Sequence, residues 1–343
     1  MWILTIVSLL CLGSWANTLK LAGKWRFEYY YYDFVFGILL TAGLAALLLG
    51  AGRAQELTFQ DNLTLAGYRK MAWALGGGVV LNLGMLLLLA AMTISGMTVS
   101  FGLTLGVALV IGVVWDFTDA TQANATLAFI GVALLLMAVI VTGLAHVRRL
   151  RVEREAAQQA LTPDPRVKTK RRPAPGAALN FVLAAVGGIA LSTFPRILSE
   201  ATGGENGLAP YSALLLLAVS ALLSSPFFVL FFTTFPVAVP AGSPAGYLAG
   251  TRMQHLLGVA GGILWGGGML TGLLSMSAPP VTQPSALSQY MLRNGALVVA
   301  ALWGLFIWRE FRDAGDRARL LAMGMTVSFL IGLGLVAFAF SPK

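Results

Sequence analysis

Charged residues are scarce in this sequence, and their scarcity decides the class of protein. Asp, Glu, Lys and Arg make up 11% of the 343 residues, whereas hydrophobic residues make up 57%. A soluble domain carries roughly 25% charged residues, so a chain of this composition has too little polar surface to fold in water. The sequence therefore predicts an integral membrane protein whose main partner is the lipid bilayer.

Cysteine and histidine are nearly absent as well. Cys11 is the single cysteine, which excludes an intramolecular disulfide and a cysteine-based zinc site. His146 and His255 stand far apart at the ends of apolar segments, and the sequence has no HExxH pattern, no GxxxxGK[ST] nucleotide loop and no paired-carboxylate motif. We expect no cofactor, no metal and no catalytic residues, and we interpret the chain as something other than an enzyme.

Ten apolar stretches are long enough to cross the hydrocarbon core, which takes about 20 helical residues. They cover residues 2–19, 34–52, 71–93, 97–115, 125–147, 177–195, 210–237, 254–276, 285–308 and 319–340. One long, polar, proline-punctuated run separates the first five from the last five, and its first part is expected to extend the fifth helix. We predict an all-α protein with ten transmembrane helices, divided into residues 1–147, a basic cytoplasmic linker at 148–176, and residues 177–343.

Lys and Arg are unevenly distributed between the two sides of the predicted membrane. They gather on the side of the central linker, and short basic loops remain in the cytoplasm, so both termini are predicted outside. The net charge of +9 comes from segment ends and one loop, which suits a membrane and argues against nucleic acid. We expect a multi-pass protein of the bacterial inner membrane, with anionic lipid bound at the 148–172 linker.

The first apolar segment resembles an export signal but lacks the basic residues that should precede it. Lys20, Lys24 and Arg26 follow the apolar run instead, and they would hold its end in the cytoplasm. We therefore expect a retained first helix. The four consecutive tyrosines at 29–32 are interpreted as an aromatic belt at the cytoplasmic interface.

An internal repeat links segments three and eight. GGVVLNLGML at 77–86 aligns without gaps with GGILWGGGML at 261–270. Because each half has five segments, two such copies cross the membrane in opposite directions, which is the inverted-repeat plan of many secondary transporters. In that plan the solute binds near the midplane. The alternative is that these glycines serve only close helix packing.

Two residues within the repeat are candidates for solute binding. Asn82 lies near the middle of segment three, where a buried amide needs a partner; that partner is a polar solute or, equally well, another helix. Trp265 lies at the same depth in segment eight. Its ring would be a stacking surface for a flat or sugar-like ligand, and core filling is the alternative reading.

Three residues near the start of the chain are further candidates for the solute path. Trp15, Asn17 and Thr18 end the first apolar segment, about one turn before its basic residues. If they face the centre of the bundle, they contact the solute at the cytoplasmic end. If they face lipid or another helix, they only anchor the chain.

Charged residues within or beside the apolar segments complete the set of candidates. Arg293 interrupts segment nine, where a charge is costly unless it pairs with a solute, serves an outer gate or reaches the surface. Glu28 and Asp33, at the cytoplasmic edge, are candidates for coupling to an ion gradient, and Asp116 is a candidate at the outer end. Uncoupled facilitated diffusion is an open alternative.

Several stretches resemble a known family. GSWANTLKLAGKWRFEYYYYDF, GGGVVLNLGMLLLLAAMTISGMTVSFGLTLGVALVIG, GGILWGGGM and IWREF are similar to the ureide permease and glucose/ribose porter branch of the drug/metabolite transporter superfamily. The resemblance implies a basket of ten helices in two inverted halves and transport by alternating access. It also implies substrates among ureides, nucleobases and sugars. The linker lacks the nucleotide-loop-like motif of the plant members.

These observations lead to a functional hypothesis. The chain is expected to move a small polar solute, a sugar or a ureide or nucleobase, driven by a proton or sodium gradient or by diffusion alone. A drug or metabolite exporter of the same fold is an alternative, as is a membrane sensor or scaffold that transports nothing. The glycine-rich helix faces suit a homodimer or only the fold of one chain.

Overall fold

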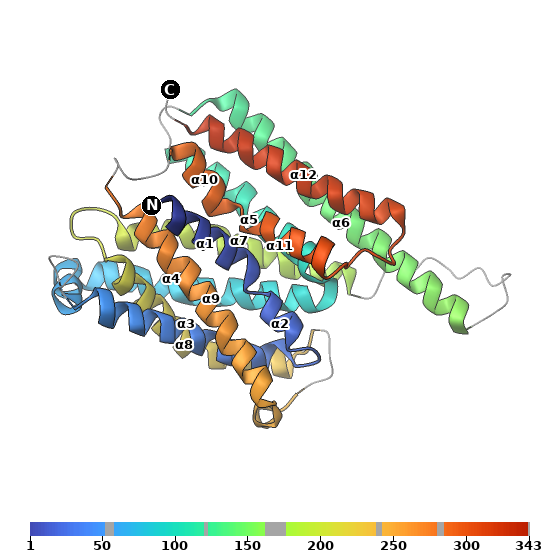
Figure 1. The fold of residues 1–343 in the computed structure, drawn as a ribbon, viewed down its shortest axis with the longest axis horizontal. Helices are drawn as coiled ribbons and strands as arrows, with labels where there is room; N and C mark the ends of the chain where they lie inside the picture. The colour runs from blue at the N-terminus through green and yellow to red at the C-terminus, as the bar shows by residue number, and fades with distance from the viewer. Residues whose placement is uncertain (52–57, 120–122, 162–175, 238–241, 280–284, 342–343) are drawn as a thin grey trace.

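The structure, a computed structural model, describes residues 1–51, 58–119, 123–161, 176–237, 242–279 and 285–341 (Figure 1). Its elements, in chain order, are α1 (Trp2–Ser14), α2 (Asn17–Leu21), α3 (Phe27–Leu49), α4 (Phe59–Ser95), α5 (Met97–Asp119), α6 (Ala125–Leu161), α7 (Ala177–Thr202), α8 (Pro210–Thr234), the 3-10 helix η1 (Pro244–Ala249), α9 (Arg252–Met276), α10 (Ala286–Asn294), α11 (Ala296–Leu302), the π-helical turn η3 (Trp303–Ile307) and α12 (Asp316–Ala339).

Long apolar helices make up most of the molecule. Within the described ranges there is no strand, and nine helical stretches are long and apolar enough to cross a membrane when α1 and α2 are taken together. The prediction of an all-α integral membrane protein is confirmed. The ten-helix count is not, because predicted segment 285–308 is interrupted at Gly295 and continues as a shorter apolar helix, Ala296–Ile307.

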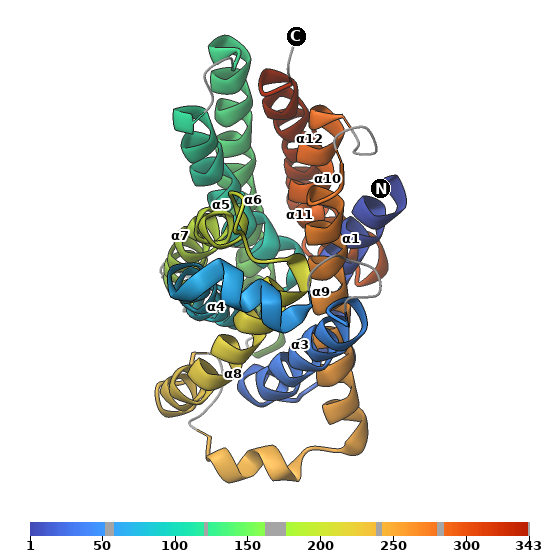
Figure 2. The same ribbon diagram turned by 90° about the vertical axis from the view of Figure 1, so that its left-hand side faces the viewer.

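The helices pack in matched pairs. α4 lies against α7 and α8, and α9 lies against α1 and α3. α5 contacts α7, just as α10 and α11 contact α1. α3 also contacts α8, α5 contacts α11 and α6 contacts α12, and α6 and α12 run side by side in both views (Figures 1 and 2). All of these pairs join the first half of the chain to the second. With α1 and α2 counted as one helix, and α10 and α11 as another, a shift of five helices converts the first three pairs, α4–α7, α4–α8 and α5–α7, into the pairs of α9 with α1, of α9 with α3, and of α10 and α11 with α1. The same shift maps α3–α8, α5–α11 and α6–α12 onto themselves.

The aligned glycines make the corresponding contacts in the two halves. A Cβ on Gly78 would lie 2.5 Å from a backbone oxygen of α8, and a Cβ on Gly262 would collide with the backbone of α3. A Cβ on Gly84 would lie 2.7 Å from a leucine of α7, and one on Gly268 would lie 2.9 Å from the Cys11 side chain in α1. Small residues thus allow close helix approach at equivalent places.

The tyrosines lie deeper than their sequence pattern suggested. α3 begins at Phe27 rather than near residue 34, so all four tyrosines belong to the helix. Tyr29, Tyr30 and Tyr31 are buried against neighbouring helices. The interpretation as an interface belt is therefore wrong for these three residues, because their rings pack within the protein instead of facing lipid headgroups.

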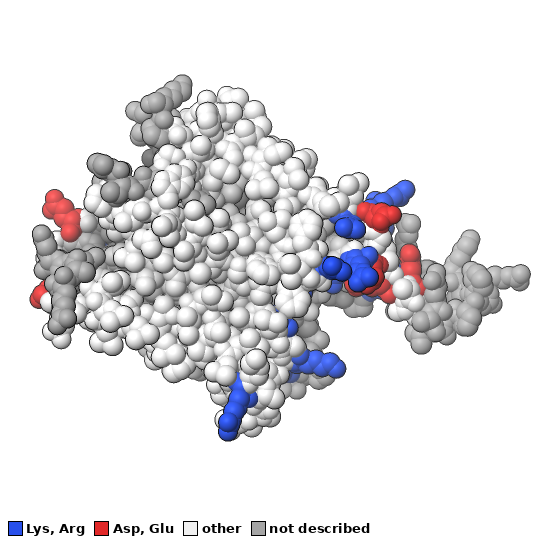
Figure 3. All heavy atoms as spheres, in the orientation of Figure 1, with Lys and Arg blue, Asp and Glu red and all other residues white. Residues whose placement is uncertain are grey.

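Charge is confined to the two ends of the visible surface. Lys and Arg gather where α6 projects from the bundle and along the lower edge nearby, whereas most of the face between the ends carries no charge (Figure 3). The N-terminus and the end of α12 lie on the side away from the tip of α6 (Figure 1). α6 continues to Leu161, so the start of the polar run does extend the fifth predicted helix.

Candidate functional site

A buried aromatic cluster lies where α3 meets α9 and the junction between α1 and α2. Phe34 of α3 is its centre, with ring centroids 4.8 Å from Trp15, 5.6 Å from Tyr31 and 6.4 Å from Trp265. All four side chains are buried. Trp15 and Trp265, two predicted site residues from distant parts of the sequence, therefore both pack against the Phe34 ring. The cluster joins the first and second halves of the chain.

Thr18 lies at the edge of this cluster. Its hydroxyl donates to the backbone oxygen of Trp15 at 2.8 Å and lies 2.6 Å from the Tyr30 hydroxyl. Since the threonine proton is used on Trp15, Tyr30 donates to Thr18. A side chain on Gly261 would collide with both hydroxyls, so the glycine lets α9 approach them. Thr18 faces the protein interior and does not anchor the chain in lipid.

Asn82 approaches the cluster from α4. Its Nδ2 donates to the Ala221 backbone oxygen at 3.0 Å and to the Ser224 hydroxyl at 2.6 Å, both in α8. Tyr31 donates to the backbone oxygen of Asn82 at 3.2 Å. The helix–helix hydrogen bond that the sequence left open is thus present. The Oδ1 atom is buried, and no partner for it occurs among the described residues.

Asp33 adjoins Phe34 in α3 and meets the first turn of α9. Its Oδ2 lies 2.9 Å from His255 Nδ1, and its Oδ1 accepts a 2.6 Å hydrogen bond from the Tyr247 hydroxyl in η1. Burial and the neighbouring Asp33 carboxylate raise the pKa of Tyr247 above its usual range, so the phenol remains a donor. Gly258, one turn after His255, allows this approach, since its Cβ would lie 2.5 Å from that of Asp33.

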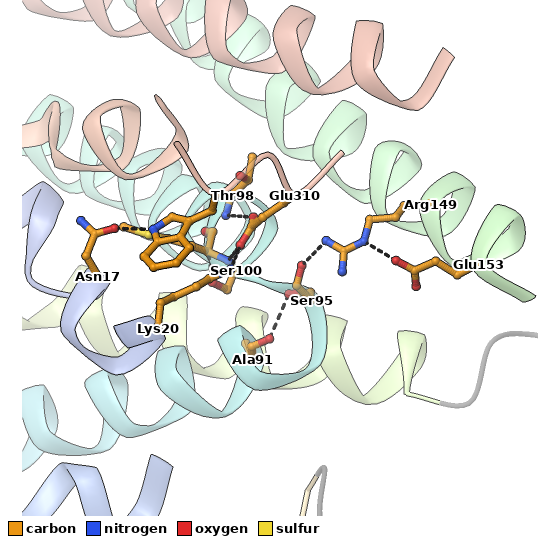
Figure 4. Close-up of polar contacts among 11 residues, drawn as sticks. Asn17, Lys20, Ala91, Ser95, Thr98, Ser100, Arg149, Glu153 and Glu310 are labelled. Carbon is orange, nitrogen blue, oxygen red and sulfur yellow. Dashed lines mark hydrogen bonds and ion pairs between the residues drawn. The ribbon is translucent and has the colours of Figure 1, made fainter. Parts of the chain in front are cut away.

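Asn17 and Lys20 take part in a different group of contacts at the basic end of the molecule. Asn17 Oδ1 accepts a 2.6 Å hydrogen bond from Trp308 Nε1, and Lys20 pairs with Glu310. Figure 4 shows these side chains reaching from α2 toward the segment that follows η3 and the start of α5. Asn17 therefore closes a helix contact and does not line the aromatic cluster.

Glu310 joins this group to the first turn of α5. Its carboxylate accepts from the backbone N–H of Met97 at 2.7 Å and of Thr98 at 2.8 Å. Burial by itself would raise the pKa of Glu310, but Lys20 and the two amides together hold that pKa below its usual value. A charged carboxylate at a helix N-terminus also suits the helix dipole.

The three remaining charged candidates lie outside the cluster. Arg293 of α10 lies 3.7 Å from Asp116, near the end of α5 opposite to Glu310, and both side chains are partly exposed. Glu28 pairs with Arg26 at 2.8 Å in the first turn of α3. Within the described parts of the chain, no group of three His, Cys, Asp or Glu residues is placed to hold a metal ion.

Comparison with known proteins identifies related sequences. Residues 30–172 match the family model described as Ureide permease. The resemblance to ureide permeases is confirmed. Ureide permease 1 of Arabidopsis thaliana is 30% identical over 145 residues, which is 41% of this chain and 37% of the relative. Ureide permease 4 of the same plant is 32% identical over 148 residues, with coverage of 41% and 37%.

The matches span less than half the length of these ureide permeases. The family model runs from α3 to the linker and so contains Asp33, Phe34 and Asn82. Trp265 and His255 lie beyond it, in α9. The sequence did not predict His255 or Tyr247 as site residues. His255 precedes the glycine-rich face of α9 by one turn, and this position is the sequence feature that could have indicated it.

Proposed function

We propose that this chain is a secondary transporter that moves a small polar solute of the ureide type across the membrane by alternating access. The observation that carries the proposal is the match of residues 30–172 to the ureide permease family. Ureides, nucleobases and sugars share a small polar framework with several hydrogen-bonding groups. A permease, in contrast to an enzyme, needs no catalytic residue, only a site that recognises such groups and two gates.

The aromatic cluster is our proposed solute path. Solute sites in proteins combine apolar and aromatic walls with a few polar groups that fix orientation. Trp15 and Trp265 offer flat rings, Thr18 a hydroxyl, and Asn82 a buried Oδ1 without a hydrogen-bond partner within the described structure. An unused buried acceptor is costly, and a ureide N–H would satisfy it. These features support binding between α3, α4 and α9.

The two ends of α5 supply candidate gates. Lys20 and Glu310 link α2 to the first turn of α5 at the basic end, and Arg293 and Asp116 lie together at the opposite end. Alternating access requires that the closures at the two ends open in turn. We further propose that residues 1–147 and 177–343 are two inverted repeats separated by the linker at 148–176, and the matched helix pairs support this proposal.

The proposed orientation places the basic end in the cytoplasm of a bacterial cell and both termini outside. The gathering of Lys and Arg where α6 projects supports it (Figure 3). Anionic lipid is the proposed partner of the 148–172 linker, of which residues 162–172 lie outside the described structure. Homodimer formation through glycine-rich faces is a further proposal.

Uptake into liposomes tests the function directly. The purified chain is reconstituted, and entry of labelled allantoin, uracil and ribose is measured with and without a proton or sodium gradient. We expect entry of at least one solute to exceed that into protein-free liposomes and to saturate. A solute that the protein moves only from its cytoplasmic face to its outer face would favour the exporter. No entry of any solute in either direction would favour the sensor or scaffold and contradict transport.

A further inference from the structure

The contact between Asp33 and His255 combines a shielded carboxylate with an imidazole that is partly exposed at the surface of the protein. The Asp33 side chain is 7% exposed, and that of His255 is 28% exposed. Both oxygens of the carboxylate are occupied, one by His255 Nδ1 and the other by the Tyr247 hydroxyl. The pair joins α3 to the first turn of α9. Tyr247 lies in η1, in the connection between α8 and α9, and its bond to Asp33 ties that connection to α3.

Aromatic rings hold the imidazole in place. The Trp25 ring meets His255 edge-on at a centroid distance of 4.7 Å, and the Tyr247 ring does so at 4.8 Å. Trp25 and Tyr247 are themselves stacked at 6.4 Å. A Cβ on Gly250 would lie 2.7 Å from His255 Nε2, so the glycine keeps space beside the nitrogen that does not bind Asp33. The arrangement orients Nδ1 toward the carboxylate and places Nε2 beside Gly250.

The groups around the pair are mainly uncharged. Among the described residues, Tyr247 of η1 and Tyr30 of α3 interact with Asp33, and Tyr32 of α3 interacts with Tyr247. Arg26 and Glu28 precede them on α3 and form an ion pair with each other. From the side of α2, the Thr18 hydroxyl reaches Tyr30.

We propose that Asp33 and His255 form the proton-binding site of this protein and couple proton movement to solute movement. This proposal rests on the proposed transport function. Binding of one proton converts a neutral imidazole, which donates Nδ1–H to Asp33, into an imidazolium whose new proton is on Nε2. The proton comes from water at the exposed edge and returns to water when the site faces the other side. The charge of the pair changes from minus one to zero.

The location of the pair explains how it would act on the solute path. Asp33 is adjacent to Phe34, the centre of the aromatic cluster, and His255 and Trp265 belong to the same helix. A charged pair that becomes neutral is less costly to enclose in a low-dielectric bundle. Protonation would therefore favour the closed contact of α3 with α9, and with it the arrangement of Trp15 and Trp265 around Phe34.

Tryptophan fluorescence tests the proton site without any solute. Protonated imidazole quenches a neighbouring indole, and Trp25 is the indole against His255. We expect the emission of the purified full chain to differ between mildly acidic and mildly alkaline buffer, and the difference to disappear in His255→Gln and in Trp25→Phe. His146→Gln is the matched control, since His146 is the other histidine and packs against Phe181 in α7. An unchanged transition in His255→Gln overturns the proton site.

Transport in reconstituted liposomes tests the coupling, with labelled allantoin as the probe. In His255→Gln and Asp33→Asn we expect accumulation driven by a pH gradient to fall about tenfold or more, while exchange of internal for external allantoin is retained. His146→Gln should keep both. Equal loss of accumulation and exchange, or full retention of accumulation, overturns the coupling role. If the unaltered chain moves no allantoin in either assay, the transport proposal fails, and the fluorescence titration still decides the proton site.

Discussion

Two helix crossings in this protein have the same packing and different chemistry. α9 crosses α3 at Gly262, and α4 crosses α8 at the aligned Gly78. The first crossing carries Asp33 and His255 next to the aromatic cluster, whereas the second carries the amide of Asn82 bonded to α8. The repeated packing requires small residues at matched positions, but it leaves the other faces of the helices free to diverge. Functional asymmetry can therefore arise on a symmetric framework.

The largest effect is expected from filling a crossing. Gly262→Leu places a side chain into the backbone of α3, and such overpacking costs about 3 kcal/mol or more. Gly78→Leu should have a comparable effect if the crossings are equivalent. Gly267→Ala is the control, because no atom lies within 4 Å of its Cβ position. Melting in detergent checks this; a Gly262→Leu protein that melts with the parent contradicts the packing account.

A smaller effect is expected from Glu310→Gln, which tests whether the basic end of the molecule is held by charge. Loss of the charged bonds to Lys20, Met97 and Thr98 should cost about 1 to 3 kcal/mol.

The dependence of this effect on pH has a definite sign. The pKa of Glu310 is lowered in the folded chain, so its contribution is fully present above the unfolded value of about 4.3 and is lost as pH falls through the folded pKa. Melting temperatures measured in acid should therefore decline less in the variant than in the parent. Parallel declines would exclude Glu310 as a stabilising charge.

Asn82→Ala distinguishes solute binding from helix packing at the second crossing. The two lost bonds to α8 should each cost about 0.6 kcal/mol, and at most about 1.7 kcal/mol. Ser224→Ala is the matched control, because this substitution removes one hydrogen bond of Asn82 Nδ2 and leaves Asn82 Oδ1 unchanged. If Oδ1 binds the solute, allantoin uptake falls in Asn82→Ala and persists in Ser224→Ala. Equal uptake in the two variants would assign Asn82 to packing alone.

The smallest effect is expected at the end opposite to Glu310. Arg293 and Asp116 are partly exposed and 3.7 Å apart, and exposed ion pairs contribute about 1 kcal/mol or less. Arg293→Gln should therefore change the melting temperature little, with any change reduced by salt. A loss as large as that of Glu310→Gln would show that the two ends of α5 are held equally firmly.

The sequence predicted what depends on composition and local pattern. Scarce charge and long apolar runs predicted the membrane helices, and the glycine repeat predicted matched close contacts. The pattern also drew attention to Trp15 and Trp265, whose rings do meet around Phe34. These features can be predicted from sequence because each segment must by itself be apolar and carry small residues at its helix contacts.

The remaining features depend on how separate helices are rotated against one another. Asp33 and His255 are 222 positions apart, and nothing local to either residue indicates the other. The bond from Glu310 to the start of α5 has the same origin. The interruption of the ninth segment at Gly295 was also missed, because a hydropathy pattern counts apolar residues and does not register a break between α10 and α11.

The most direct measurement is allantoin uptake by a pair of tryptophan variants in liposomes. Trp265 belongs to the aromatic cluster, whereas Trp73 of α4 is 38% exposed on the surface of the bundle. Stacking on a flat ligand contributes about 1 to 3 kcal/mol, so Trp265→Ala should reduce uptake about tenfold or more, and Trp73→Ala should leave it near that of the parent. No uptake by the parent above protein-free liposomes, or equal uptake by the two variants, would contradict a solute path through this cluster.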